Sequence, residues 1–202
     1  MNTRSNIIEV INIILKYYRK DTAFSVLLDK VVEEIRPSKK FTEQLRNEIF
    51  DDGYESFFSL INSIINEEIC KGKPKDFDKY RVNEKIRFFI FYRIQIINKL
   101  FERKRVLTIT LKHKSLLGLQ KLLFNISDEI WHQSGDESTD FNYYSKRVIL
   151  MNVYLSSYLY SIYDNSNDLD KTKLFIDKQI SRVLKFGKIK SNFKSLFYPK
   201  TM

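Results

Sequence analysis

Apolar side chains recur at steps of three and four residues along most of the chain, which is the spacing of one face of an α-helix. Glycine and proline, which interrupt helices, number only five and three in 202 residues, too few for the turns of a sandwich or barrel. They fall at intervals that suit helix ends. The predicted stops are Pro37, Gly53, Gly72 with Pro74, Gly135, Gly187 and Pro199.

The periodic segments between these stops predict an all-α fold, without a defensible pair of strands or an internal repeat. The best-defined helix spans about 141–163, with an apolar stripe of Phe141, Tyr144, Val148, Met151, Leu155, Leu159 and Ile162. The helices expected overall are about 6–18, 22–35, 41–50, 54–70, 82–103, 107–113, 115–133, 141–163 and 169–186.

The sequence offers little for several common chemistries. One cysteine, Cys70, excludes a disulfide framework and a multi-thiolate metal site within the chain. The most apolar stretch, residues 88–97, is interrupted by Arg93, so we expect no membrane-spanning helix. The first ten residues resemble neither a signal peptide nor a transit peptide.

Glu129 and His132 have the spacing of half a di-iron carboxylate site, because residues three apart share a helix face. The only other histidine, His113, has no carboxylate three residues before it, so the second half is missing. No nucleophile elbow or glycine-rich phosphate loop is present. We therefore expect neither an enzyme nor a metal or cofactor site.

The formal net charge of +10 indicates an anionic partner, and its location decides which kind. Three short helices followed by longer ones suggest a helix-turn-helix with a helical ligand domain. Residues 21–52, where the DNA-reading helix would lie, carry five cations against eight acids. This net negative charge disfavours phosphate binding there.

Residues 171–202 hold nine cations and one acid. Apolar and lysine side chains alternate there at helical spacing, as in a helix lying in a membrane interface. The alternative is a last helix packed on the core with a solvated basic face. The residues expected to touch a membrane are Phe186, Lys188, Ile189, Lys190, Phe193, Lys194, Leu196 and Phe197.

Residues 128–147, DEIWHQSGDESTDFNYYSKR, combine acids with aromatics at a predicted helix junction. This stretch resembles the signature of the lipid-binding accessory protein family of ubiquinone (coenzyme Q) biosynthesis, Trp-(His)-x-x-Gly-Asp-x-Ser-x-Asp-(Phe)-Asn-Trp-Tyr-(Thr/Ser)-(Lys/Arg)-Arg. Asp164, Ser166 and Asp168 match a later Asp-x-Ser-x-Asp stretch. The resemblance is strong over about residues 128–185 and thin over the N-terminal half. Tyr143 replaces the family's tryptophan, which makes the anchor smaller.

The resemblance implies a dimeric TetR-like fold whose helix-turn-helix no longer binds DNA, with an apolar pocket for an isoprenoid lipid or quinone intermediate. It also implies a partner, the di-iron demethoxyubiquinone hydroxylase, that would hold the iron itself. The partner-binding residues carried over are Asp128, Ile130, Trp131, Asp140, Tyr143, Tyr144 and Arg147. The expected pocket lining, with ordinary core as the alternative, is Phe88, Phe89, Tyr92, Leu116, Leu119, Leu123, Met151, Leu155, Tyr158 and Leu159.

The sequence thus predicts a helix-turn-helix-like part (residues 1–75), a helical lipid-binding domain (76–187) and an amphipathic C-terminal helix (188–202). The expected function is to take isoprenoid quinone intermediates from the membrane and present them to the hydroxylase. The protein would be peripheral on the cytoplasmic side of the inner membrane, or on the matrix side in a eukaryote. The alternatives are a TetR-type DNA-binding regulator and an enzyme using Glu129 and His132.

Overall fold

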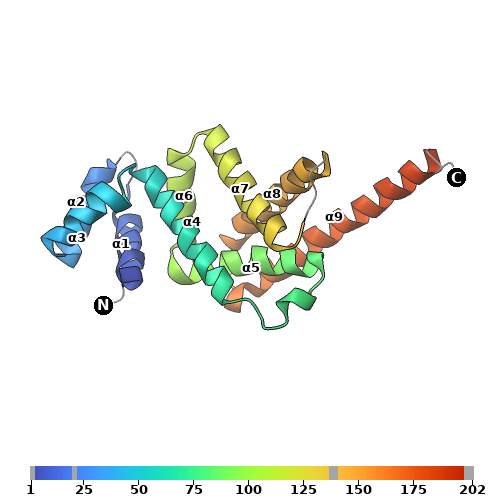
Figure 1. Ribbon diagram of the computed structural model, residues 1–202, viewed down its shortest axis with the longest axis horizontal. Coiled ribbons are helices and arrows are strands. Elements are labelled where there is room, and N and C mark those ends of the chain that lie inside the picture. Colours follow the sequence, from blue (N-terminus) through green and yellow to red (C-terminus); the bar gives the residue numbers. More distant parts are fainter. Residues whose placement is uncertain (1–2, 20–21, 137–140, 198–202) are drawn as a thin grey trace. The chain divides into compact units, whose positions relative to one another are not determined.

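Helices make up all the regular structure in the described parts of the computed structural model, which are residues 3–19, 22–136 and 141–197 (Figure 1). Side chains are described for residues 6–19, 22–136 and 142–185. The helices are α1 (Thr3–Tyr17), α2 (Phe24–Ile35), α3 (Lys39–Gln44), α4 (Tyr54–Lys71), α5 (Val82–Leu100), α6 (Arg103–His113), α7 (Leu116–Gln133), α8 (Phe141–Ser161) and α9 (Asp170–Phe197), with a π-helical turn at Leu45–Ile49 and 3-10 turns at Phe77–Lys79 and Asn167–Leu169.

The all-α class is confirmed, and the order of helices is consistent with a TetR-like fold. Most boundaries fall within a few residues of those expected from the glycine and proline positions. The stop expected at Gly187 is wrong, because α9 continues through it to Phe197. A helix tolerates an isolated glycine at a cost of about 1 kcal/mol, so glycine alone does not end it.

The chain divides into two compact units, residues 1–73 with 96–119 and residues 74–95 with 120–202. In the first unit, α1 packs on α2, and the interior is filled by side chains with at most 1% exposure. These side chains are Val10, Ile11, Ile14, Leu15, Leu27, Val31, Leu45, Phe57 and Ile109.

The helix-turn-helix-like segment of this unit neutralises part of its own positive charge. Arg46 Nη2 lies 2.5 Å from Asp29 Oδ1, and Lys30 Nζ lies 2.7 Å from Glu33 Oε2. Both pairs are solvent-exposed, so they add little stability. They place acids beside cations on the surface where a DNA-reading protein would present cations alone.

In the second unit, α8 lies against α9 (Figure 1). The buried side of α8 includes two serines without measurable exposure, Ser157 and Ser161, whose hydroxyls donate to carbonyls of their own helix. Small side chains allow the two helices to approach closely. The apolar stripe predicted for α8 lies largely elsewhere, since Tyr144, Val148 and Leu159 are 62%, 45% and 41% exposed.

The connection from α8 to α9 is held by the buried carboxylate of Asp164. Its Oδ2 accepts hydrogen bonds from the backbone N–H and hydroxyl of Thr172, at 2.7 and 2.6 Å, and its Oδ1 accepts from the N–H and hydroxyl of Ser166. Burial by itself would raise the pKa of Asp164, but these hydrogen bonds lower it well below its usual range. Asp164 thus caps the first turn of α9 as a charged acceptor.

Candidate lipid and partner site

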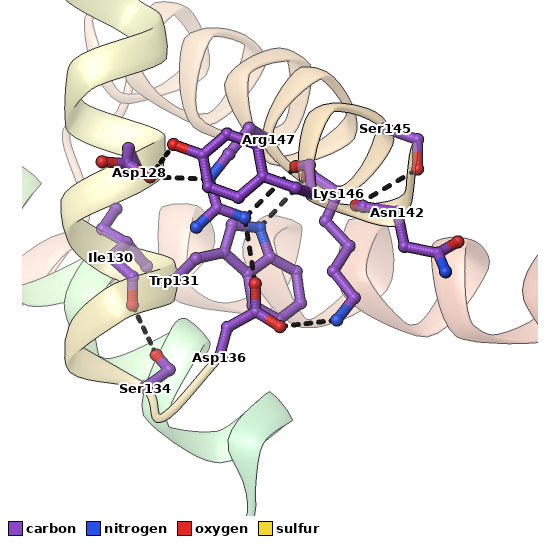
Figure 2. Close-up of polar contacts among 10 residues, drawn as sticks. Asp128, Ile130, Trp131, Ser134, Asp136, Asn142, Ser145, Lys146 and Arg147 are labelled. Atoms are coloured by element: carbon purple, nitrogen blue, oxygen red, sulfur yellow. Dashed lines mark hydrogen bonds and ion pairs between the residues drawn. The ribbon is translucent and has the colours of Figure 1, made fainter. Parts of the chain in front are cut away.

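A charged and aromatic cluster joins the end of α7 to the start of α8 (Figure 2). At its centre the Arg147 side chain, 3% exposed, lies between two carboxylates. Arg147 Nε donates to Asp128 Oδ1 at 2.6 Å, and Nη1 donates to Asp136 Oδ2 at 2.9 Å. Two acids around one buried guanidinium tie the two helices together.

Two aromatic rings pack against this ion network. The Arg147 guanidinium lies 3.5 Å from the centre of the Tyr143 ring, and the Tyr143 hydroxyl donates to Asp128 Oδ1 at 2.9 Å. The Trp131 indole N–H donates to the Lys146 carbonyl at 3.1 Å, and Lys146 Nζ lies 5.3 Å from the indole ring. These contacts fix both rings, because each polar group of the aromatic residue has a partner.

Burial would raise the pKa of Asp128, but hydrogen bonds from Arg147 and Tyr143 outweigh it and lower that pKa. The pKa of the Tyr143 hydroxyl is raised by its hydrogen bond to Asp128, which favours the protonated donor. Asp128 and Arg147 are therefore charged, and Tyr143 is neutral, at neutral pH.

The local sequence explains why α7 turns toward α8 here. Gly135 adopts a φ of +88°, which favours glycine, and Ser134 donates its hydroxyl to the Ile130 carbonyl at 2.7 Å. The turn brings Asp136, the residue after Gly135, to two cations. Its Oδ2 pairs with Arg147, and its Oδ1 lies 2.5 Å from Lys146 Nζ. Asp136 and Lys146 match the signature's Gly-Asp and (Lys/Arg)-Arg positions, but they were not among the residues carried over for partner binding.

Of the residues carried over for partner binding, the structure brings together Asp128, Trp131, Tyr143 and Arg147, and Tyr144 packs edge-on to Tyr143. Tyr144 is 62% exposed, whereas Ile130 is 3% exposed and faces the core. Asp140 lies outside the described residues. The exposed members of the set are thus held in place by the buried ones.

An apolar cavity of about 400 Å³ opens beside the cluster and shares Trp131 with it. Its volume lies in the usual range of small-molecule sites, about 300–1,000 Å³. The walls come from α5, α7, α8 and α9, and Asn83 supplies the only amide side chain. The lining residues are Val82, Asn83, Ile86, Trp131, Ile149, Leu150, Val153, Ile180, Val183 and Leu184.

The lining expected from the sequence is distributed differently. Phe88 and Tyr92 stack at 5.1 Å and line a second cavity of about 390 Å³ beside the Arg87–Asp177 ion pair. Phe89, Leu123 and Tyr158 are buried, and Met151 and Leu155 are half-buried. Leu159 is 41% and Leu116 72% exposed. Leu116 and Leu119 belong to the first unit, and the other eight belong to the second.

Two further expectations concern metals and membranes. The described residues contain no group of three or more side chains suited to a metal ion, and Glu129 accepts a hydrogen bond from Gln133 instead. No described helix is both long and apolar enough to span a bilayer. The side chains expected to touch a membrane, Phe186, Lys188, Ile189, Lys190, Phe193, Lys194, Leu196 and Phe197, lie outside those the structure describes.

Together the fold and site define an all-helical protein with an apolar cavity beside a charged aromatic surface. Residues 118–187, which hold most of this site, match the COQ9 family model. The resemblance to the ubiquinone accessory family is therefore confirmed over these residues.

Several curated proteins that are similar in sequence to this chain are also named COQ9. The chain is 28% identical over 136 residues to "Ubiquinone biosynthesis protein COQ9, mitochondrial" of Rattus norvegicus, covering 67% of this chain and 44% of the relative. It is 27% identical over 136 residues to the Homo sapiens protein (67% and 43%), and 36% identical over 74 residues to the Bos taurus protein (37% and 23%). The chain spans less than half the length of these relatives.

Proposed function

We propose that this protein is a lipid-binding accessory factor of ubiquinone biosynthesis. It takes an isoprenoid quinone intermediate from a membrane and presents it to the di-iron demethoxyubiquinone hydroxylase, without catalysing a step itself. Its place is peripheral on the inner membrane, on the matrix side in a eukaryote. The relatives are named as mitochondrial proteins of ubiquinone biosynthesis, which supports the proposed process and location.

The observation that carries this proposal is the double position of Trp131. Its ring lines the cavity, and its N–H belongs to the cluster that joins α7 to α8. Trp131 thus places the cavity next to the cluster that contains Asp128 and supports Tyr144. That adjacency suits a protein that transfers a poorly soluble ligand to a docked enzyme.

The chemistry of the cavity favours an isoprenoid chain. Nine of its ten lining residues are hydrophobic, so a chain entering it exchanges lipid contacts for side-chain contacts at little cost. Ile149 and Leu184, at 44% and 45% exposure, keep its edge open. Asn83 offers one amide that can bind a quinone oxygen.

The partner surface is proposed to consist of exposed side chains supported by buried ones. The side chain of Asp128 is 42% exposed and that of Tyr144 is 62% exposed, which leaves a carboxylate and an aromatic ring available to the hydroxylase. Arg147 is buried and acts by holding Asp128 and Tyr143 in position. An aromatic anchor with a charged rim is typical of a protein interface.

A second copy of the chain is the proposed cover for the exposed apolar side of α8. Val148, Leu155 and Leu159 recur at steps of seven and four on this side, and the first and last are more than 40% exposed. Leu174 of α9 is 59% exposed. Contiguous exposed apolar residues mark interaction sites, and self-association about a two-fold axis is the commonest solution.

Lipid binding is tested by native mass spectrometry and lipid extraction of the purified protein. Leu184→Asp places a charge at the cavity edge and should abolish the bound isoprenoid. Val26→Asp on α2, at 48% exposure and outside the cavity lining, is the matched control and should retain it. Equal lipid content in the two variants, or none in the wild type, contradicts the proposal.

Partner binding is tested with the purified hydroxylase. Tyr144→Ala should weaken binding at least tenfold without changing the free energy of unfolding, because the side chain is mostly exposed. Tyr163→Ala, with 82% exposure outside the cluster, should leave binding unchanged. If Tyr144→Ala changes stability alone, the residue is structural. In cells, deleting the gene should lower ubiquinone and accumulate its demethoxy precursor, and normal quinone levels would refute the function.

A further inference from the structure

The turn between α6 and α7 exposes three leucines to solvent. Leu111 is 55%, Leu116 72% and Leu117 77% exposed, and all three lie in the first compact unit. Soluble proteins usually bury leucine, and clustered exposed apolar side chains mark an interaction surface. We call Leu111, Leu116 and Leu117 together the leucine turn.

The polypeptide around the leucine turn is strongly basic. Residues 103–117 contain five lysines and arginines and no acid. Lys104, Thr108 and Leu111 follow one another at steps of four and three, so they share a face of α6, and Lys112 is adjacent. Lys104, Thr108, Leu111 and Lys112 are all exposed. Leucine and lysine are thus presented on one surface.

The conformation of the leucine turn is fixed by hydrogen bonds and ion pairs of its backbone and of the side chains that flank it. The Ser115 hydroxyl accepts a hydrogen bond from the Gly118 N–H at 3.0 Å, which caps the first turn of α7. Lys114 pairs with Glu55 and lies 5.0 Å from the centre of the Phe58 ring. With Lys114 fastened to α4, the two residues that follow Ser115 project outward in the first turn of α7.

We propose that the leucine turn is a membrane-contact site for an anionic lipid surface. The leucines enter the boundary between headgroups and acyl chains, and Lys104 and Lys112 contact lipid phosphates. Insertion into the membrane interface removes the exposed leucine side chains from water, which is favourable. Residues 103–117 contain cations and no acid, so their charge is complementary to that of the anionic headgroups. The leucine turn shares no residue with the lining of the lipid cavity or with the C-terminal segment.

A second contact has a physical consequence for residence on the membrane. One shallow apolar anchor gives marginal, reversible binding, and stable attachment takes two signals. The leucine turn supplies one signal within the described structure, whatever the C-terminal segment adds. We therefore expect its loss to shorten residence on anionic membranes.

The test measures partition of the full chain onto vesicles of phosphatidylcholine alone or mixed with phosphatidylglycerol. Leu116→Ser combined with Leu117→Ser should lower the partition coefficient on anionic vesicles about tenfold, and Lys112→Glu should lower it severalfold. The matched controls are Val26→Ser, 48% exposed on α2, and Lys39→Glu on α3, which should bind as the wild type does.

A fluorophore on Leu117→Cys in a Cys70→Ser background should shift to the blue when anionic vesicles are added. Unchanged partition of the leucine variant, or no shift, overturns the proposal. If the leucine variant changes the molecular mass measured by light scattering but binds vesicles as the wild type does, the leucine turn mediates self-association. That result would also overturn the proposal. The leucine variant should keep its bound isoprenoid and its hydroxylase affinity, so failure here is distinguishable from failure of the proposed function.

Discussion

Arg147 and Asp136 form an ion pair whose two side chains are almost fully removed from solvent. Nη1 lies 2.9 Å from Oδ2, and the side chains are 3% and 5% exposed. The pair joins residues eleven apart in sequence, one just after α7 and one within α8. The geometry of the candidate partner surface therefore depends on two residues that a partner would barely touch.

Asp136→Asn should lower the free energy of unfolding by about 3 kcal/mol, because removing one member of a buried pair leaves an uncompensated charge. Asp128 continues to neutralise Arg147 in part, so the domain should still fold. Urea denaturation measures the change. Asp29→Asn, which breaks an exposed pair with Arg46, should cost less than about 1 kcal/mol. Equal effects would show that burial of the pair contributes nothing.

Asp164→Asn should destabilise the protein by about 2 kcal/mol at pH 7, because a charged acceptor of four hydrogen bonds becomes neutral. The pKa of Asp164 is lower in the folded than in the unfolded chain. Its stabilisation is therefore complete above the unfolded-state pKa of about 4 and is lost as the pH falls through the folded-state value.

Denaturation of the Asp164→Asn variant and wild type across this pH range checks the prediction. The difference in unfolding free energy should shrink as the solution is acidified from about pH 4. A difference that stays constant would mean that the ionised form of Asp164 is not the stabilising species.

The exposed side of α8 predicts a dimer that charges introduced on this side would disrupt. Val148→Asp combined with Leu159→Asp should convert a dimer to a monomer in light scattering, since two like charges would meet across a two-fold interface. Because both side chains are over 40% exposed, the monomer should remain folded by circular dichroism. Val26→Asp on α2 is the control and should leave the mass unchanged. A wild-type monomer would refute the proposed interface.

The helix-turn-helix-like segment predicts an absence of specific DNA binding. Duplexes from the region upstream of the gene should bind weakly at low salt and not at physiological salt, because residues 21–52 are net negative. Lys39→Ala combined with Lys40→Ala should change nothing measurable in an electrophoretic shift. Salt-sensitive, sequence-specific binding that this double variant abolishes would favour the regulator hypothesis.

The helices were predictable because the scarce glycines and prolines fall between periodic apolar segments. Gly53 has a φ of +55° and precedes α4, as its position suggested, but Gly187 carries no such constraint and α9 passes through it. Local sequence shows that a helix can stop, while packing decides whether it does. For this reason the helix end predicted at Gly187 was wrong.

The site was predictable in composition but not in geometry. The signature indicated Trp131, Tyr143 and Arg147, and the structure brings them together. It could not indicate that Arg147 is buried, since burial depends on how α7 meets α8. The stripe on α8 led to the same difficulty, because periodicity identifies an apolar face without saying whether core, ligand or another copy covers it.

Trp131 is the only tryptophan in the chain. Its ring lines the cavity, and Lys146, whose ammonium lies over that ring, belongs to the cluster that supports the candidate partner surface. Intrinsic fluorescence excited at the indole band therefore originates from one position in the whole molecule. A quinone entering the cavity would quench that emission, and an enzyme docking outside would alter its anisotropy. The unlabelled protein thus contains an intrinsic fluorescent probe for quinone binding and for docking of the enzyme, and the two events can be separated in a single stopped-flow trace.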